Sequence, residues 1–271
     1  MLVSGSGTFL LGVGCQKGGT AWLHRYLEAS PQCDPGFRKE YHIWDSLDLD
    51  SGRLARERIE KQGGQRAGFL LDPERYFDYF TGLLAAPGTR LTADITPGYA
   101  ALPVSRLEMV RAGFEARGVR PVAAYLLRDP VERIWSAARM DMRRRGDDAP
   151  EDPETRVGHM YRHRMYADRT RYDLTMDALE QAFPREAVFY GFYERLFSAQ
   201  TLAPLCALLG IDFHEPDTGR QVNVSPKSEG AVLPEDTRRT IAQHFAPVYD
   251  AVQQRFPELD LAELWPSARL L

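Results

Sequence analysis

The sequence predicts an α/β fold with a central parallel sheet covered by helices on both faces. Short apolar runs typical of strands alternate with longer stretches in which apolar residues recur at helical spacing. No internal repeat or low-complexity tract interrupts this alternation, and Gly and Pro are spread along the chain instead of gathering in one linker. Strands that alternate with helices favour parallel pairing. We therefore expect residues 1–271 to form one domain.

The composition is that of a globular protein. Hydrophobic residues make up 44% of the chain, and 34 Lys and Arg against 38 Asp and Glu leave a net charge of −4. These values exclude a disordered or collagen-like chain, and no apolar run approaches the roughly 18 residues that a membrane span needs. The weakly acidic balance gives no reason to expect nucleic acid as a partner.

Cysteine usage and the first residues predict a cytoplasmic protein. Cys15, Cys33 and Cys206 are odd in number and lack metal-type spacing, so we expect reduced thiols. The apolar patch at 8–14 has no basic segment before it and no cleavage site after it, which favours a strand over a signal peptide.

Each element follows from the local pattern. The strand at 8–14 leads through a Gly-rich turn into a helix over 20–29. Further strands are expected at 41–44, 90–95, 122–127 and 187–192, and further helices at 73–84, 103–117, 130–145, 172–183, 194–209 and 234–255. The irregular stretches 45–72 and 146–171 are expected to be acceptor or lid loops, although a solvated surface excursion also explains the second.

The turn after the first strand has the chemistry of a phosphate site. Residues 14–22 read Gly-Cys-Gln-Lys-Gly-Gly-Thr-Ala-Trp. Glycines let backbone N–H groups close on an anion, the helix N-terminus adds positive potential, and Lys17 supplies a full charge. Only four of the 34 basic residues are Lys, the compact cation that fits a narrow loop beside a phosphate. Because Lys17 precedes the two glycines, the turn is not a Walker A sequence, in which Lys follows the last Gly.

A second anion-binding pattern follows the strand at 122–127. Arg128 leaves the end of that strand and can offer a guanidinium fork to a phosphate, while Ser136 lies about two turns into the next helix. Residues 126–136 read Leu-Leu-Arg-Asp-Pro-Val-Glu-Arg-Ile-Trp-Ser. With residues 17–23, they resemble the two nucleotide motifs of sulfotransferases that use 3′-phosphoadenosine-5′-phosphosulfate (PAPS).

This resemblance implies a three-layer, P-loop-like sulfotransferase fold and a cofactor site. The 5′-phosphosulfate would be held by Lys17, Gly18, Gly19, Thr20 and Ala21, and the 3′-phosphate by Arg128 and Ser136. No metal is required, and Lys17 would offset charge on the bridging oxygen as the bond to sulfur breaks.

Two weaker similarities concern the adenine and the 3′-phosphate. Residues 188–196 resemble the family strand that ends in Tyr-Glu, which implies that Tyr193 and Trp22 hold the adenine; core packing is the alternative for both. Lys227 lies where many relatives close a basic loop over the 3′-phosphate, and a solvated loop lysine is the alternative.

The general base is expected in residues 38–45, Arg-Lys-Glu-Tyr-His-Ile-Trp-Asp. They resemble the Lys-Glu-x-His string of glycosaminoglycan-type and many bacterial sulfotransferases, in which the Glu is the base. We therefore expect Glu40 to take the proton, with His42 as support or alternative base. In a strand the two side chains would share a face. A structural ion pair of Glu40 with Arg38 or Lys39 is the alternative.

The expected acceptor is a hydroxyl or amine of a small molecule or glycan. Residues 94–99 look like the family's Lys-Thr-Pro-x-Tyr segment, but the usual Lys is replaced by Asp94, two residues before Thr96, or by Ile95, one residue before it. This departure argues against a heparan-like polyanion as the acceptor. One rival is a P-loop kinase or NTPase that uses ATP and Mg²⁺, with Asp94 as a Walker B-like acid. Another is a non-catalytic nucleotide-binding protein.

Overall fold

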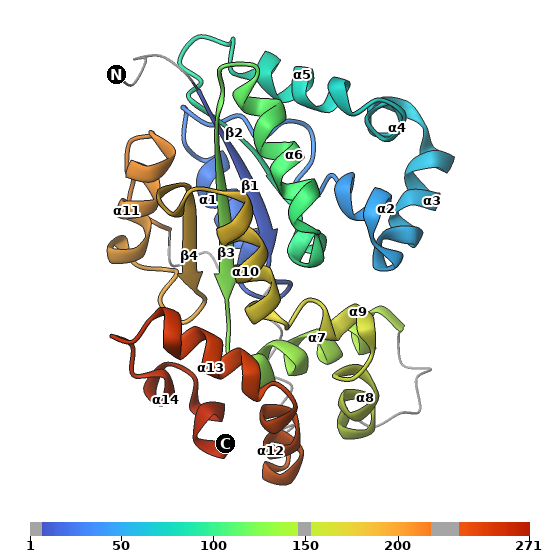
Figure 1. The fold of residues 1–271 in the computed structure, drawn as a ribbon, viewed down its shortest axis with the longest axis vertical. Coiled ribbons are helices and arrows are strands. Elements are labelled where there is room, and N and C mark those ends of the chain that lie inside the picture. The colour runs from blue at the N-terminus through green and yellow to red at the C-terminus, as the bar shows by residue number, and fades with distance from the viewer. Residues whose placement is uncertain (1–6, 146–152, 218–232) are drawn as a thin grey trace.

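The computed structural model describes residues 7–145, 153–217 and 233–271, and Figure 1 shows a central sheet between helices. In these ranges four strands pair in parallel in the order β2–β1–β3–β4. They are β1 (Thr8–Gly14), β2 (Leu91–Ile95), β3 (Arg120–Leu127) and β4 (Val188–Phe192). The predicted α/β class with a central parallel sheet is confirmed.

Hydrophobic cores cover both faces of the sheet, and β1 and β3 alternate their side chains between these two cores. In β1, Phe9, Leu11 and Val13 enter the larger core and Leu10 enters the smaller one. The larger core lies under α5 (Pro73–Leu83), α6 (Val104–Glu115), α10 (Tyr172–Ala182) and α13 (Ala246–Arg255), and the smaller under α1 (Thr20–Glu28) and α11 (Ala199–Leu209).

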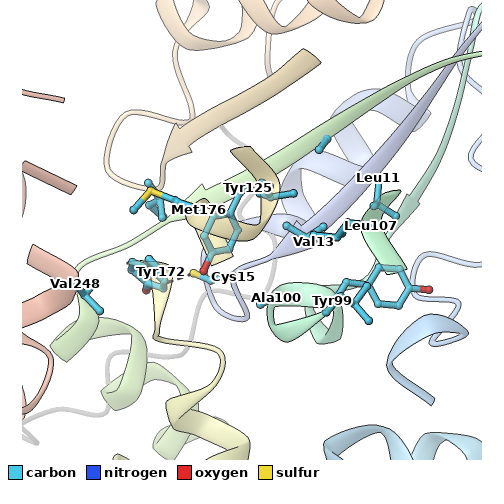
Figure 2. Packing of buried hydrophobic residues seen from close by; sticks show 14 of the residues in the cluster. Leu11, Val13, Cys15, Tyr99, Ala100, Leu107, Tyr125, Tyr172, Met176 and Val248 are labelled. Atoms are coloured by element: carbon cyan, nitrogen blue, oxygen red, sulfur yellow. Dashed lines mark hydrogen bonds between the residues drawn. The ribbon is translucent and has the colours of Figure 1, made fainter. Parts of the chain in front are cut away.

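The larger core reaches the turn that follows β1. Figure 2 shows Tyr125 and Tyr172 beside Cys15, with Leu11 and Val13 further along the strand. The Cys15 Sγ lies 3.6 Å from the Tyr172 hydroxyl, which in turn donates to the carbonyl of Arg128 at 2.9 Å. These contacts tie the ends of β1 and β3 to the start of α10.

The strand expected at 41–44 is wrong. The backbone takes a left-handed turn at His42 (φ 56°), and helix α2 (Trp44–Asp48) begins two residues later. Side chains, and not a neighbouring strand, accept the backbone donors here: Tyr41 N–H donates to Thr96 Oγ1 at 2.9 Å, and Ile43 N–H donates to the Tyr99 hydroxyl at 3.1 Å.

Two expected helices have different bounds. A turn occupies the residues after β4, so α11 begins at Ala199 instead of residue 194. The helix expected at 234–255 is divided into α12 (Glu235–His244) and α13, with Phe245 between them and Pro247 in the first turn of α13. Proline fits a first turn but interrupts a helix interior, because it has no N–H to donate.

Residues 45–72 are helical, which corrects the expected loop. After α2 come the 3₁₀ helix η1 (Asp50–Gly52), α3 (Arg53–Gln62) and α4 (Gly64–Leu71). In α3 only Ile59 is buried, and ion pairs four residues apart join Arg53 to Glu57 and Arg56 to Glu60, so the apolar periodicity that predicts helices is missing.

The described part of the stretch 146–171 contains two helices, α8 (Pro153–Met160) and α9 (Arg164–Ala167), each followed by a turn. The other elements are α7 (Pro130–Arg145), α14 (Leu261–Leu264) and the 3₁₀ helices η2 (Pro97–Ala101), η3 (Arg185–Ala187) and η4 (Pro266–Leu270). None of the helices in the described ranges has both the length and the apolar character that crossing a bilayer requires.

Candidate active site

A cavity of about 450 Å³ lies beyond the carboxyl ends of the strands, where the arrowheads of β1 and β3 point toward α7. This is where ligands bind in parallel α/β sheets. Its lining comprises Gln16, Lys17, Gly19, Thr20 and Ala21 after β1, Lys39, Glu40 and His42 before α2, Pro97 and Gly98 after β2, Arg128 after β3, Ser136, Arg139, Met140 and Arg144 of α7, Arg169 after α9, and Tyr193 after β4.

The turn after β1 is shaped for close approach of an anion. Gly19 has a φ of 96°, and a Cβ there would lie 2.6 Å from Leu196 Cδ2. A Cβ on Gly18 would lie 2.7 Å from Cys15 Sγ, so both positions require glycine. In the described part of the chain, the amides of Lys17, Gly19, Thr20 and Ala21 have no internal acceptor. They form a set of free donors at a helix N-terminus.

Lys17 lies among cations. Within the described ranges its amine has no hydrogen-bond or ion-pair partner. Burial and, after it, the positive charges of the neighbouring arginines together lower the pKa of Lys17 to about 8; these arginines are, in order of effect, Arg143, Arg128, Arg139 and Arg144. A cluster of like charges is unfavourable by itself and becomes favourable when an anion binds.

The predicted 3′-phosphate residues lie in the same cavity. Arg128 donates from Nη1 to the carbonyl of Lys17 at 2.9 Å and stacks 4.3 Å from the centre of the Tyr193 ring. Its Nε is buried and has no partner among the described residues, which leaves a donor for a ligand. Ser136 is nearly buried and borders the cavity from α7.

The two predicted adenine residues are placed differently. Tyr193 borders the cavity, whereas Trp22 is 8% exposed, does not line it, and stacks on Tyr26 with ring centres 5.5 Å apart. Phe197, which sequence reasoning missed, makes edge contacts with both Trp22 at 5.0 Å and Tyr193 at 5.3 Å. The sequence signal for Phe197 was its place four residues after Tyr193. Lys227 lies outside the described residues.

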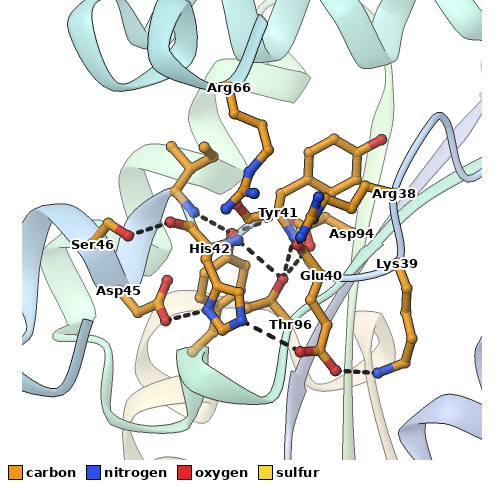
Figure 3. A network of polar contacts seen from close by, with 12 residues as sticks. Arg38, Lys39, Glu40, Tyr41, His42, Asp45, Ser46, Arg66, Asp94 and Thr96 are labelled. Carbon is orange, nitrogen blue, oxygen red and sulfur yellow. Dashed lines mark hydrogen bonds and ion pairs between the residues drawn. The ribbon is translucent and has the colours of Figure 1, made fainter. Parts of the chain in front are cut away.

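Glu40 and His42 meet although the segment is not a strand. Figure 3 shows Glu40 between Lys39 and His42, and His42 between Glu40 and Asp45. The Lys39 ammonium donates to Glu40 Oε1, and His42 Nε2 lies 3.3 Å from Glu40 Oε2. His42 Nδ1 lies 2.7 Å from Oδ2 of Asp45, whose side chain is 2% exposed. Asp45 was missed, although its place three residues after His42 was a signal.

The charges of Lys39, Glu40, His42 and Asp45 decide which of these side chains carry a proton. Burial opposes ionisation of Glu40, but its hydrogen bond with His42 and the charge of Lys39 outweigh that effect and lower its pKa to about 2. Burial likewise opposes protonation of His42, but hydrogen bonds to Asp45 and Glu40 raise its pKa to about 9. At neutral pH Glu40 is therefore a carboxylate and His42 an imidazolium, so Glu40 is the group free to take a proton.

Asp94 is part of the scaffold of the site. Its carboxylate is fully buried and accepts hydrogen bonds from the hydroxyls of Thr96 at 2.6 Å, Tyr99 at 2.8 Å and Tyr76 at 2.9 Å. Thr96 in turn holds the Tyr41 amide. Asp94 thus orients the segment that carries Glu40. Among the described residues, no group of three or more His, Cys, Asp or Glu is arranged to hold a metal ion.

Comparison with known proteins gives a match at the level of structure. No protein-family model and no curated protein matches the chain. The structure of a sulfotransferase from Alicyclobacillus acidocaldarius superposes with a TM-score of 0.64 at 21% identity, covering 95% of this chain and 98% of that one.

Two further solved structures superpose less closely. The sulfotransferase domain of the Synechococcus PCC 7002 olefin synthase gives a TM-score of 0.46 at 15% identity, covering 91% of this chain and 98% of that one. The sulfotransferase domain from the curacin biosynthetic pathway gives 0.47 at 20% identity, covering 90% and 98%. The superposition on the Alicyclobacillus acidocaldarius structure shows that this chain has the sulfotransferase fold, as residues 17–23 and 126–136 predicted.

Proposed function

We propose that this protein transfers a sulfuryl group from PAPS to a hydroxyl or amine of a small-molecule or glycan acceptor, and that residues 1–271 act as one domain. The observation that carries the proposal is the unpartnered Lys17 ammonium beside a glycine turn, in a cavity that also contains Arg128, Arg139 and Arg144. Such a site suits a ligand with several negative charges. The shared fold with a known sulfotransferase supports this ligand class.

The residues present fit PAPS. The free amides at Lys17, Gly19, Thr20 and Ala21 suit the oxygens of a phosphosulfate, and the unpartnered Nε of Arg128 with Ser136 suits a 3′-phosphate. PAPS supplies an activated sulfuryl group attached to a phosphate leaving group. Tyr193 offers an aromatic face at the same end of the cavity.

Catalysis in this proposal depends on positioning and charge. Lys17 neutralises charge on the departing phosphate. Glu40 accepts the acceptor's proton, and its low basicity is sufficient because a loose transition state forms little bond to the nucleophile, which loses its proton late. His42, oriented by Asp45, fixes the Glu40 carboxylate within 3.3 Å.

The contacts of Asp94 disfavour the kinase rival. A Walker B-like acid needs a free oxygen near bound Mg²⁺. Here three hydroxyl groups occupy the carboxylate, which is fully buried and does not line the cavity.

Thermal unfolding tests the cofactor. We expect adenosine 3′,5′-bisphosphate at about 100 times its Kd to raise Tm by about 5–10 °C, and AMP to raise it less. Arg128→Ala should reduce the bisphosphate shift. The control Arg195→Ala changes an exposed arginine outside the cavity and should keep it. A shift with ATP and Mg²⁺ alone would reject this proposal in favour of the kinase.

A further inference from the structure

Arg169 lines the cavity but has no role in the proposed function so far. It follows α9, is partly buried, and lines the cavity with Glu40 and His42. Within the described ranges, its guanidinium makes no hydrogen bond and no ion pair. Its neighbour Arg133 differs, because Arg133 is fully buried and donates to the carbonyls of Tyr166 at 2.9 Å and Gln16 at 3.5 Å. Arg133 is therefore a structural residue, whereas Arg169 has unused donors.

The surroundings of Arg169 place it at the acid–base end of the cavity. Burial lowers the pKa of Arg169, the charge of Arg133 lowers it further, and the carboxylates of Asp45 and Glu40 oppose the shift. The charges that lower the pKa of Lys17 are instead those of the arginines of α7 and of Arg128. Arg169 therefore feels the charges of Glu40 and Asp45, whereas Lys17 feels those of Arg128 and the arginines of α7.

The carboxylates near Arg169 already have partners. Glu40 binds Lys39 and His42, and Asp45 binds His42. A partly buried guanidinium without a counter-ion is costly, and an oxyanion that enters the cavity would offset that cost. The acceptor's reacting group must lie beside Glu40 to lose its proton, so the acceptor is the ligand closest to Arg169.

We propose that Arg169 binds an oxyanion of the acceptor, so that the acceptor is a small hydroxy or amino compound that also carries a carboxylate or phosphate. This inference rests on the proposed function. A single guanidinium fork pairs with one oxyanion in two parallel hydrogen bonds. One such pair is sufficient to hold an acceptor with a single carboxylate or phosphate, so the site does not require a polyanionic glycan.

Matched phenols test this inference on the intact protein saturated with adenosine 3′,5′-bisphosphate. Calorimetry compares 4-hydroxybenzoate, 4-hydroxyphenylphosphonate and the neutral 4-hydroxybenzamide. We expect at least one anion to bind about 10- to 100-fold more tightly than the amide. Which anion is preferred distinguishes a carboxylate from a phosphate acceptor. Arg169→Gln should bring the ratio close to one, and Arg169→Lys should keep part of it.

Two controls separate binding from folding. Arg162→Gln removes an exposed arginine of the same segment, outside the cavity, and should keep the wild-type ratio. Without ligand, Arg169→Gln should melt at or above the wild-type temperature because it breaks no internal bond. Arg133→Gln should melt lower because two carbonyls lose their donor.

The outcomes distinguish the two proposals. Failure of the wild type to bind the bisphosphate would reject the proposed function itself. Normal bisphosphate binding with equal affinity for the acids and the amide would reject only the role of Arg169. Equal weakening of all three phenols in Arg169→Gln would also reject it, because the loss would then not depend on the charge of the phenol.

Discussion

His42 Nδ1 lies 2.7 Å from Asp45 Oδ2, so a nearly buried carboxylate in α2 holds the imidazole that faces Glu40. We expect Asp45→Asn to lower the pKa of His42 from about 9 toward its ordinary value of 6.5, because an amide carries no charge. Titration of the His42 ring by NMR measures this shift. Asp48 lies in α2, as Asp45 does, and binds Arg106 of α6. Asp48→Asn should therefore leave the pKa of His42 unchanged. An unchanged His42 pKa in Asp45→Asn would show that Glu40 alone sets it.

Glu40→Gln tests the base. The amide keeps the shape of the side chain but cannot accept the proton, so we expect kcat to fall about 10²- to 10⁴-fold. Affinity for adenosine 3′,5′-bisphosphate, measured by calorimetry, should change less than about twofold, because Lys17 and Arg128 hold the anion. Glu60→Gln, on an exposed face of α3, serves as the matched control. Full activity in Glu40→Gln would move the base to another residue, and an inactive wild type that binds the nucleotide would favour the non-catalytic rival.

The ion pair of Glu40 and His42 also predicts how stability depends on pH. The pKa of His42 is raised in the folded state, so its contribution is complete below about pH 6.5 and is lost as the pH rises through about 9. The pKa of Glu40 is lowered, so its contribution is present above about pH 4.5 and is lost as the pH falls through about 2. Urea unfolding should therefore show a larger loss in His42→Gln at about pH 6 than at about pH 9.5. An equal loss at both values would mean that His42 stabilises by packing alone.

Asp129 of the second nucleotide motif is expected to act on stability instead of ligand binding. It is buried, accepts the Val131 amide at 2.9 Å at the start of α7, and accepts the amide of Ser267 at 3.1 Å and its hydroxyl. Asp129→Ala removes a helix cap and leaves the buried Ser267 amide without its acceptor, which should cost about 2–4 kcal/mol in urea unfolding. Asp72→Ala removes the exposed cap of α5 and should cost only about 1 kcal/mol. Equal losses would show that the tie to the C-terminal segment adds nothing.

The features that could be predicted from the sequence are those that a local residue pattern determines. Short apolar runs located β1 to β4, and the glycines and cations of residues 14–22 and 126–136 located the cavity. The pattern failed where tertiary contacts decide the backbone. The extended segment at Tyr41 resembles a strand, but the hydroxyls of Thr96 and Tyr99 accept its amides. Helix α3 buries one residue and could not be seen by periodicity.

Residues in or beside the cavity that lack a motif were missed for a similar reason. Asp45 and Phe197 act through contacts with residues already singled out, and neither extends a recognised string. Arg169 lies in a stretch with several arginines, and only the structure separates it from its exposed neighbour Arg162.

Asp94 gives a prediction that also separates the two enzyme classes. Burial raises its pKa to about 6, although three hydroxyl groups oppose the shift. Because the folded state binds this proton more tightly than the unfolded state, stability should fall as the pH rises from about 3.8 to about 6, by about 3 kcal/mol in total. Asp94→Asn should remove this dependence, measured as the difference from wild type in urea unfolding, whereas the exposed Asp250→Asn should not. Bisphosphate binding should persist in Asp94→Asn, since the residue orients Thr96 and does not line the cavity. If the variant instead loses an Mg²⁺-dependent affinity for ATP, Asp94 is a metal-directed acid and the sulfotransferase assignment is wrong.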